Sequence, residues 1–274
     1  MTSLRAGRVQ GLVAVVTGAA RGQGRAHAVR LAEEGADLVL LDACAAVTEL
    51  GYPPATDGDL DETVALAEKA GARTVAGRAD VRVLDEIRSV VADGVREFGR
   101  IDIVVANAGI SAWGRLWEIT AEQWQSVLDT NLTGVWHTLK ATVPTMIDGG
   151  RGGSIITISS VAGIKSLPGQ AHYSAAKHGV VGLTGTAALE LAPYGIRANS
   201  VHPWAVDTAM ATDSTLTALL HEHAHYLASF GQVLGTPKLA TPRDIADAVL
   251  WLASDESRTV TGVALPVDLG ATSV

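Results

Sequence analysis

Cysteine and long apolar runs are both scarce in this sequence of 274 residues. The single cysteine, Cys44, cannot form a disulfide within the chain, and it is more typical of a small buried hydrophobe than of a redox centre. No apolar segment approaches the ~20 residues that cross a bilayer, and the start of the chain lacks the charged-then-apolar pattern of a signal peptide. We therefore expect a cytoplasmic protein without a membrane partner.

Positive charge is scarce too. Lys and Arg number 21 against 29 Asp and Glu, the net charge is −8, and basic residues form no run. Binding to nucleic acid or to an anionic membrane depends on clustered cations. The composition therefore argues against a nucleic-acid partner.

Apolar and small residues are abundant: 47% of the chain is hydrophobic and 29 residues are glycine. Strand-like apolar runs alternate with helix-like stretches, which indicates parallel strands with helices on both faces. We expect strands near Leu12, Leu38, Thr74, Ile101, Ser154, Arg197 and Val263, and helices from about Gly22, Leu60, Leu84, Glu122, Tyr173, Thr215 and Arg243. The predicted fold is α/β, a single-domain Rossmann-type doubly wound parallel sheet of about seven strands over residues 1–274. Right-handed crossovers place the carboxyl ends of such strands along one crevice.

A glycine-rich turn, Thr17 to Gly24, follows the first expected strand. Gly18 lets the chain turn, Gly22 lets the backbone approach a pyrophosphate, and Gly24 permits close packing of helix on strand. Free amides at the start of the next helix bind the anion. The glycine spacing is wider than in the usual fingerprint, but the context predicts a dinucleotide site.

The second expected strand ends at Asp42, whose carboxylate can accept hydrogen bonds from the adenosine ribose hydroxyls. This favours NAD over NADP. Arg21 argues weakly the other way, since a guanidinium beside the turn could meet a 2′-phosphate, but Asp42 would repel that phosphate. We therefore predict NAD.

Tyr173 and Lys177 are four residues apart in a helix-like segment, so they share a face. A free tyrosine has a pKa near ~10, whereas proton transfer works best near ~7, a difference of about 4 kcal/mol. A lysine ammonium nearby, and an oxidised nicotinamide, would stabilise the phenolate. With the hydroxyl of Ser160, these residues predict a site that oxidises or reduces a carbon–oxygen bond.

Several motifs follow one another in a fixed order. They are Thr17 to Gly24, Asp80-Val81, Asn107-Ala108-Gly109, Asn131, Ile158-Ser159-Ser160, Tyr173-Ser174-Ala175-Ala176-Lys177 and Asn199-Ser200-Val201-His202-Pro203. Together they resemble the short-chain dehydrogenase/reductase family over nearly the whole chain. The resemblance implies an enzyme acting on CH-OH donors, and a homotetramer in which the helices starting near Glu122 and Tyr173 pair across subunits.

The resemblance also implies roles for residues. Tyr173 exchanges the proton, and Lys177 lowers its pKa and holds the nicotinamide ribose. Ser160 bonds the substrate oxygen and Asn131 anchors a relay water; Ser160 is preferred to Ser159 because it lies thirteen positions before the tyrosine. Asp80 and Val81 would hold the adenine, Asn107 to Gly109 would line the cleft, and Pro203, Val206 and Thr208 would border the nicotinamide. The implied cofactor site comprises Gly18, Arg21, Gly22, Gln23, Gly24, Asp42, Asp80, Val81, Asn107, Ala108, Gly109, Tyr173, Lys177, Pro203, Val206 and Thr208.

A narrower resemblance links the chain to the mycofactocin-associated, carveol dehydrogenase-like branch of the family. It rests on Arg21 to Leu31, on the insert containing Tyr52-Pro53-Pro54-Ala55-Thr56, on Gly150 to Ser154, and on His172 to Gly179. It implies a tightly held NAD that an external redox carrier re-oxidises, and secondary alcohols such as monoterpenols as substrates.

Two segments are expected to cover the site. The cofactor-side insert near residues 43–58 is long, and long ordered loops are often functional; we expect residues 52–56 to fold over the dinucleotide, the alternative being an exposed insertion without a role. The segment near 204–238 is expected to cap the substrate, with Trp204, Met210 and an apolar stripe (Leu216, Leu219, Leu220, Leu227 and Phe230), joined by Trp113 and Trp117. Such a wall suits an apolar alcohol or ketone, although apolar stripes also pack against the body of a fold.

Other functions stay open at this point. His221-Glu222-His223-Ala224-His225 matches a zinc-hydrolase pattern that would put His221 and His225 on one helical face. We expect those two to face solvent, with His223 on the apolar side. An ordinary exchanging NAD(P)-dependent ketoreductase, a hydroxysteroid-type dehydrogenase and a catalytically silent NAD-binding sensor or scaffold are the remaining alternatives.

Overall fold

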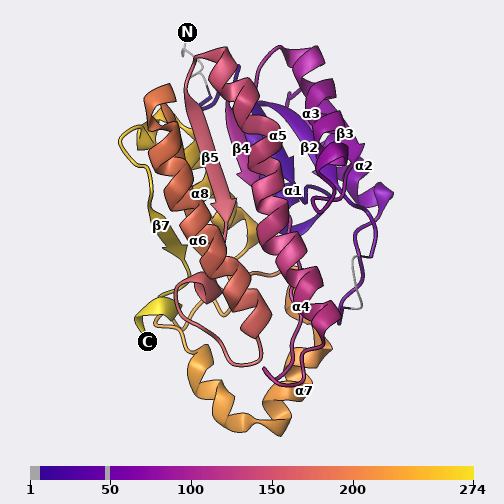
Figure 1. Cartoon of the computed structure of the whole chain (residues 1–274), viewed down its shortest axis with the longest axis vertical. Coiled ribbons are helices and arrows are strands. Elements are labelled where there is room, and N and C mark those ends of the chain that lie inside the picture. The colour runs from indigo at the N-terminus through magenta and orange to yellow at the C-terminus, as the bar shows by residue number, and fades with distance from the viewer. Residues whose placement is uncertain (1–6, 47–49) are drawn as a thin grey trace.

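The computed structural model describes residues 7–46 and 50–274. Seven parallel strands form one sheet in the order β3-β2-β1-β4-β5-β6-β7 (Figure 1). They are β1 Val13–Thr17, β2 Asp37–Asp42, β3 Thr74–Arg78, β4 Ile103–Ala106, β5 Gly153–Ile158, β6 Ile196–Pro203 and β7 Ala264–Val267. The predicted fold is confirmed, with the strand order reversing between β1 and β4, where ligands bind in open α/β sheets.

Helices cover both faces of this sheet. They are α1 Gly22–Glu33, α2 Asp57–Lys69, α3 Leu84–Phe98, α4 Ala121–Leu128, α5 Gly134–Gly149, α6 Ala171–Leu191, α7 Ser214–Glu222 and α8 Pro242–Ala253. Alternate residues of β1 supply two core clusters: Ala14 and Val16 pack in the cluster that includes α1 and α8, and Val13 and Val15 in the one that includes α3, α5 and α6. The apolar run of β1 is buried on both sides, as expected for a central parallel strand.

Capping boxes fix where several helices begin. Thr56 caps α2 with Asp59, and Thr120 caps α4 with Gln123. In each box the threonine side chain accepts from a backbone amide of the first turn, while the third residue accepts from the backbone amide of the threonine. This cap starts α2 at Asp57, three residues before the expected position.

The structure differs from the sequence prediction in two helical segments. The helix expected from Glu122 consists of α4, a π-helical turn at Asp129–Thr133, and α5. The helix expected from about Thr215 ends as α7 at Glu222, because His223 leaves the helical conformation, and a 3-10 segment (Ala224–Phe230) follows, so the helix that the zinc-hydrolase pattern requires is not continuous. Both changes affect the site described below.

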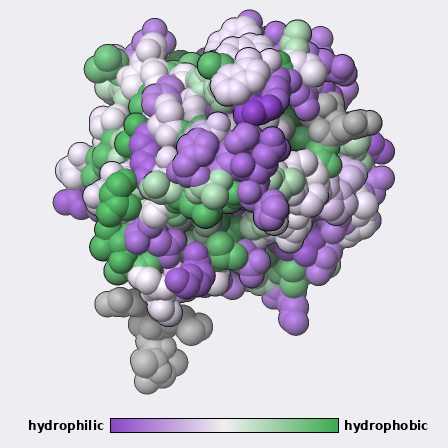
Figure 2. All heavy atoms as spheres, turned by 90° about the horizontal axis from the view of Figure 1, so that it is seen from below, coloured by the Kyte–Doolittle hydropathy of each residue, from purple (hydrophilic) through white to green (hydrophobic). Residues whose placement is uncertain are grey.

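The carboxyl ends of the strands point toward the end of the molecule that carries α7 (Figure 1). Figure 2 views that end and shows apolar residues gathered around a hollow near the middle of the face. No helix within residues 7–46 and 50–274 combines the length and the apolar character needed to cross a bilayer.

Candidate active site

A cavity of about 430 Å³ runs along the carboxyl ends of the strands. Its walls contain every residue predicted for the cofactor site and three of the four predicted catalytic residues, Ser160, Tyr173 and Lys177. Asn131 is the exception, because it lies behind the wall. The topology therefore brings together predicted cofactor residues that are up to 190 positions apart, as Gly18 and Thr208 show.

Tyr173 and Lys177 both project from the first turns of α6. The Lys177 ammonium donates to Ile158 O at 2.8 Å and lies 5.5 Å from the centroid of the Tyr173 ring. Burial lowers the pKa of Lys177 to about 8 and raises the pKa of Tyr173 to about 12, where a hydrogen bond with Ser160 opposes the rise. The groups of the chain itself thus raise the pKa of the phenol rather than lowering it as predicted, because the desolvation of phenolate outweighs its polar contacts.

The two adjacent serines after β5 have different environments. The hydroxyl of Ser159 is buried and donates to Lys177 O at 3.0 Å, which fastens β5 to α6. Ser160 is half-buried, and its hydroxyl accepts from Ala162 N at 3.1 Å at the edge of the cavity. This geometry is consistent with the preference for Ser160.

Asn131 lies in the π-helical turn between α4 and α5. Its carboxamide accepts from Ile110 N and donates to Ile110 O, both at 2.8 Å, so it holds the loop that follows β4. A Cβ at Gly109 would lie 2.9 Å from Asn131 Oδ1 and 3.6 Å from Lys177 Nζ, so this glycine fills the narrow space between them. Both polar ends of the Asn131 side chain are therefore bonded to the main chain of Ile110, which gives this residue a role in positioning the loop.

The glycine turn is held against β4 by polar contacts. Gly18 has a φ of +64°, and a Cβ on Gly24 would collide with Gly18 O. The Asn107 side chain donates to Thr17 O at 2.9 Å and to Gly18 O at 3.2 Å. These contacts hold the turn in the conformation that its glycines permit.

The residues around this turn fit a dinucleotide. No side chain caps the N-terminus of α1 at Arg21, so its first amides are available to an anion. Gln23 Oε1 is buried and has no hydrogen-bond partner in the described part of the chain. The Asp42 carboxylate is held beside the turn by Ala20 N at 3.1 Å and Cys44 N at 3.0 Å. A phosphate at the amides and a ribose at the carboxylate match these groups.

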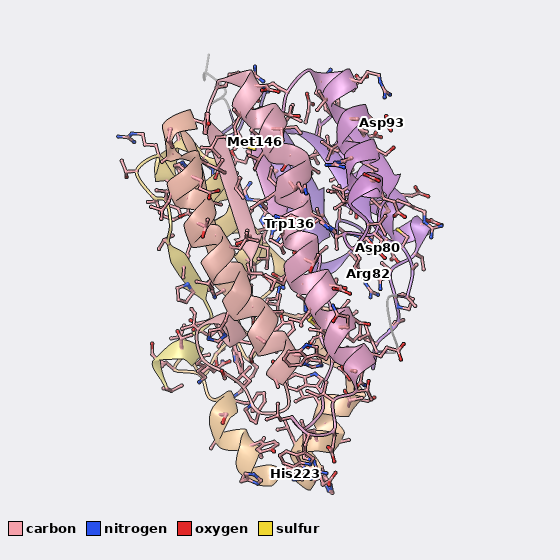
Figure 3. The ribbon with its side chains drawn as sticks, viewed as in Figure 1. Asp80, Arg82, Asp93, Trp136, Met146 and His223 are labelled. Atoms are coloured by element: carbon pink, nitrogen blue, oxygen red, sulfur yellow. The ribbon has the colours of Figure 1, made fainter. Side chains whose placement is uncertain are left out.

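Asp80 and Val81 also lie in the wall, but the carboxylate of Asp80 is already paired (Figure 3). Arg82 donates to it through Nε at 3.0 Å and through a terminal nitrogen at 2.6 Å. Burial raises the pKa of Asp80, and these bonds outweigh that effect and hold it below its usual value. If Asp80 bonds the adenine through this side chain, its carboxylate must bond Arg82 and the adenine at the same time.

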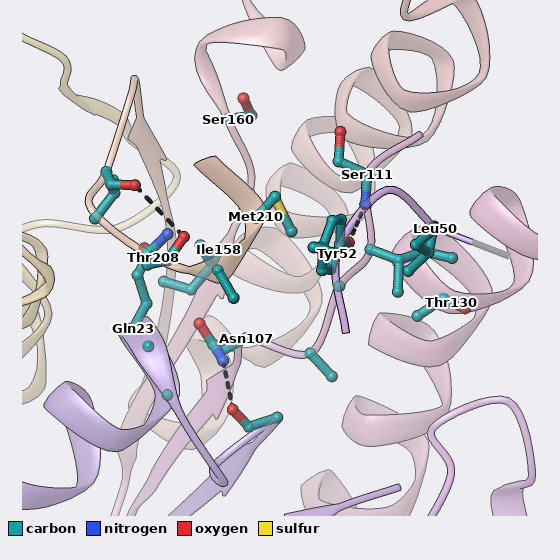
Figure 4. A pocket seen from close by; sticks show the side chains of 18 of the residues that line it. Gln23, Leu50, Tyr52, Asn107, Ser111, Thr130, Ile158, Ser160, Thr208 and Met210 are labelled. Carbon is teal, nitrogen blue, oxygen red and sulfur yellow. Dashed lines mark hydrogen bonds between the residues drawn. The ribbon is translucent and has the colours of Figure 1, made fainter. Parts of the chain in front are cut away.

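Residues 50–56, which we call the strap, run along the cavity between the loop after β4 and the glycine turn. The Arg21 guanidinium donates to Pro53 O, and the Tyr52 hydroxyl accepts from Ser111 N at 3.0 Å (Figure 4). Leu50 packs in the small cluster that also contains Tyr173. Residues 47–49 of the predicted insert lie outside the described part of the chain. Arg21 thus bonds the strap rather than standing free for a 2′-phosphate.

An aromatic row covers the substrate side of the cavity. Phe230 lies between Trp113 and Trp204, with ring centroids 6.0 Å from each. Met210 and Leu216 also line this part, as predicted. Trp117 was expected to join them, but it is 73% exposed and borders a separate hollow. The wall near the reacting groups is therefore apolar.

Comparison with known proteins agrees with this geometry. A family model described as enoyl-(acyl carrier protein) reductase matches residues 18–272. The chain is 54% identical to an uncharacterized NAD-dependent oxidoreductase of Mycobacterium tuberculosis over 98% of each chain. The chain belongs to the short-chain dehydrogenase/reductase family. It is also 45% identical to a (-)-trans-carveol dehydrogenase of Rhodococcus erythropolis, over 97% of this chain and 99% of that one.

A solved short-chain dehydrogenase from Mycobacterium paratuberculosis, bound to NAD, has the same architecture. It superposes with a TM-score of 0.95 at 48% identity and covers 98% of this chain and all of that one. The predicted family is confirmed, and so is the predicted similarity to a carveol dehydrogenase. The association with mycofactocin stays a prediction.

The histidines of the zinc-hydrolase pattern lie outside the cavity of this short-chain dehydrogenase. His221 and His225 are exposed and His223 is half-buried, as predicted; Figure 3 labels His223 at the end of the molecule that carries α7. Since α7 ends at Glu222, His221 and His225 do not share a helical face. The zinc alternative therefore loses the continuous helix that its spacing requires.

Sequence reasoning missed some polar residues of the site. His202 Nδ1 donates to Ser160 O at 2.7 Å, and its Nε2 faces the Ser200 hydroxyl at 2.8 Å, so this buried ring supports Ser160 from behind. Ser111 and Gln170 line the cavity and are bonded to each other. Gln170 is the N-cap of α6, three residues before Tyr173, so its closeness in sequence to the predicted tyrosine could have indicated it.

Proposed function

We propose that this NAD-dependent oxidoreductase transfers a hydride between nicotinamide and an apolar secondary alcohol or its ketone, carveol-like terpenols among them. The observation that carries the proposal is the position of Ser160, Tyr173 and Lys177 below an aromatic wall. An apolar wall with few polar groups binds an apolar ring and leaves its single oxygen to the hydroxyls.

In this proposal the residues of the chain orient the substrate and move one proton. The Ser160 hydroxyl bonds the substrate oxygen, and Tyr173 exchanges a proton with that oxygen. A pKa of about 12 keeps the phenol protonated, so Tyr173 can protonate a ketone oxygen directly; oxidation requires positive charge nearby to stabilise phenolate. Lys177 carries such charge below its pKa of about 8. The nicotinamide, when bound, exchanges the hydride and in its oxidised form adds positive charge.

The same proposal includes a tightly held NAD. The strap is bonded to the glycine turn through Arg21 and to the loop after β4 through Tyr52, on opposite sides of the cavity. A dinucleotide beneath it could leave only after these bonds opened. Such retention would make an external redox carrier the electron acceptor, in accord with the narrower resemblance. Loss of NAD on extensive desalting would instead favour an ordinary exchanging dehydrogenase or ketoreductase.

The decisive experiment replaces the phenol. Tyr173→Phe removes the proton donor and keeps the ring, and we expect it to lower kcat for carveol oxidation at least 100-fold, a magnitude typical of a lost general acid–base. The rate is followed with an artificial electron acceptor and, separately, with added NAD and NADP. Tyr194→Phe is the matched control, since Tyr194 is half-exposed and outside the cavity. Unchanged turnover in Tyr173→Phe would refute the mechanism.

A further inference from the structure

Two buried polar side chains interrupt the apolar wall of the substrate cavity. Ser111 is 2% exposed and Gln170 is 4% exposed, and both line the cavity together with Trp113, Leu167 and Phe230. Gln170 Nε2 donates to Ser111 Oγ at 2.9 Å. Figure 4 shows the Ser111 hydroxyl directed away from the backbone amide that bonds Tyr52. Polar atoms so placed in an apolar wall need an explanation, because burying them has a cost.

Holding the two loops together is not a sufficient explanation. Gly114 N donates to Gly169 O at 3.0 Å, so backbone already joins the loop after β4 to the loop before α6. The backbone of Ser111 is bonded to Tyr52, and the carbonyl of Gln170 accepts from Ser174 N at 2.7 Å. These bonds fix the backbone of both residues. The two side chains are therefore not needed to hold the loops together and can bind another group.

The pair has hydrogen-bonding capacity to spare. Within residues 7–46 and 50–274, Gln170 Oε1 accepts no hydrogen bond and the Ser111 hydroxyl hydrogen has no acceptor. If the carboxamide is turned over, the serine donates to Oε1, and the amide NH₂ and a serine lone pair become available instead. In both arrangements the pair presents at least one donor and at least one acceptor, so it can bond both the hydrogen and the oxygen of a hydroxyl group.

We propose that Ser111 and Gln170 form a second polar subsite, which binds an oxygen of the substrate other than the one that reacts. The preferred substrates are then secondary alcohols with a second hydroxyl or carbonyl on an apolar frame, rather than plain terpenols. This inference rests on the proposed function of the cavity and narrows its substrate class. A site that bonds a substrate hydroxyl discriminates strongly against an analogue without it, because its buried groups are left unpaired.

The test compares cyclohexanol with the 1,2-, 1,3- and 1,4-cyclohexanediols. We expect kcat/KM for the best diol to exceed that for cyclohexanol at least tenfold. In Ser111→Ala and in Gln170→Leu this ratio should fall about tenfold, and in Ser111→Thr, which keeps the hydroxyl, it should largely be retained. Ser166→Ala, an exposed serine just before Gln170 in the same loop and outside this cavity, is the control. A ratio that is the same in the wild type, Ser111→Ala and Gln170→Leu would overturn the subsite.

Binding separates this inference from the proposed function. Calorimetry on NAD-loaded protein compares the Kd of the best-binding diol with that of cyclohexanol, and needs no turnover. If no alcohol is oxidised but the diol binds tighter and loses this advantage in Ser111→Ala, the proposed function is wrong and the subsite stands. If alcohols are oxidised without preference for a diol, the subsite is wrong and the proposed function stands. Thermal melting of each variant excludes loss of folding.

Discussion

Burial sets the protonation of the two central residues in opposite directions. Lys177 is 3% exposed and Tyr173 lies in the wall of the cavity, so each charged form is desolvated. The neutral amine and the neutral phenol are both favoured by this environment. At neutral pH Lys177 nevertheless keeps its charge, since its pKa of about 8 is still above 7. The site thus holds a buried cation, which is costly for stability and useful for a reaction that develops phenolate.

This cost leads to a prediction on stability. A shift in the pKa of Lys177 from 10.5 to about 8 corresponds to a penalty of about 3 kcal/mol below pH 8. As the pH rises from 8 to 10, the folded chain loses this proton before the unfolded chain does, so the penalty fades. We expect Lys177→Met to raise the free energy of unfolding by about 1–3 kcal/mol at pH 7, after the lost bond to Ile158 O is counted, and by much less at pH 10. Urea denaturation of NAD-free wild type and variant at both pH values measures the difference, and a gain that did not shrink with pH would contradict this account.

Asp42 decides between the two nicotinamide cofactors in our account. Its carboxylate is held by Ala20 N and Cys44 N, and the alternative partner for a 2′-phosphate, Arg21, is bonded to Pro53 O. The thiol of Cys44 takes no part, since burial and the charge of Asp42 raise its pKa to about 12. We therefore propose that the preference for NAD over NADP depends on the charge of Asp42.

Replacing Asp42 by a neutral residue tests this account of cofactor preference. Asp42→Asn keeps an oxygen for the backbone amides and removes the repulsion of a 2′-phosphate. We expect the Kd for NAD to rise about tenfold and the preference for NAD over NADP to fall by more than that, from the loss of a charge-assisted hydrogen bond. Fluorescence titration with the reduced forms of both cofactors gives the four constants. An unchanged preference would show that Asp42 does not read the ribose.

The strap is the element that, in our proposal, covers the bound cofactor. Its first residue, Leu50, packs in the small cluster that also contains Tyr173, and its last residue, Thr56, caps α2. Each end of the strap is therefore in contact with the body of the fold. A Cβ on Gly51 would collide with the Asp213 carboxylate, which places the strap against the segment near 204–238 that we expect to cap the substrate. The strap and that segment are therefore in contact.

Weakening the strap should speed the release of cofactor. Tyr52→Phe leaves Ser111 N without its acceptor, and we expect dissociation of NADH to quicken about fivefold, from about 1 kcal/mol. Replacing residues 50–55 by a short Gly-Ser linker, with Thr56 kept as the helix cap, should quicken it at least tenfold. The rate is followed by the fluorescence of bound NADH after mixing with excess NAD. Tyr194→Phe serves again as the control, and equal rates in all four proteins would mean that the strap is an insertion without this role.

At the scale of the whole molecule, the helices that the family resemblance assigns to subunit contacts carry exposed apolar residues. Trp124 on α4 is 37% exposed and Leu189 on α6 is 80% exposed. Large apolar side chains in solvent are typical of surfaces that pair. We propose a homotetramer that buries these two helices.

Light scattering tests this assembly. We expect a mass of four chains of 28.3 kDa for the wild type and a smaller species for Leu189→Glu, because a buried carboxylate would lack a partner. Leu66→Glu on α2, whose leucine is 37% exposed, is the control and should stay tetrameric. A monomeric wild type would refute the proposal.

The sequence alone was enough for the architecture and for most of the site. Strand burial, helix caps and the glycine turn depend on residues near one another along the chain, and right-handed crossovers then align the strand ends. Asp42, Ser160, Tyr173 and Lys177 could be selected because each follows or faces such an end. Their proximity therefore follows from local pattern and parallel topology together.

Tertiary contacts decided what local pattern could not. Tyr52 meets Ser111 and Ser111 meets Gln170, and each contact spans 59 residues. The π-helical turn at Asn131, the end of α7 before His223 and the rise in the pKa of Tyr173 likewise depend on what packs around them. Residue order determines the fold and the chemistry at the strand ends. The course of the strap, the polar pair in the wall and the protonation of the phenol are set by segments that meet only once the chain has folded.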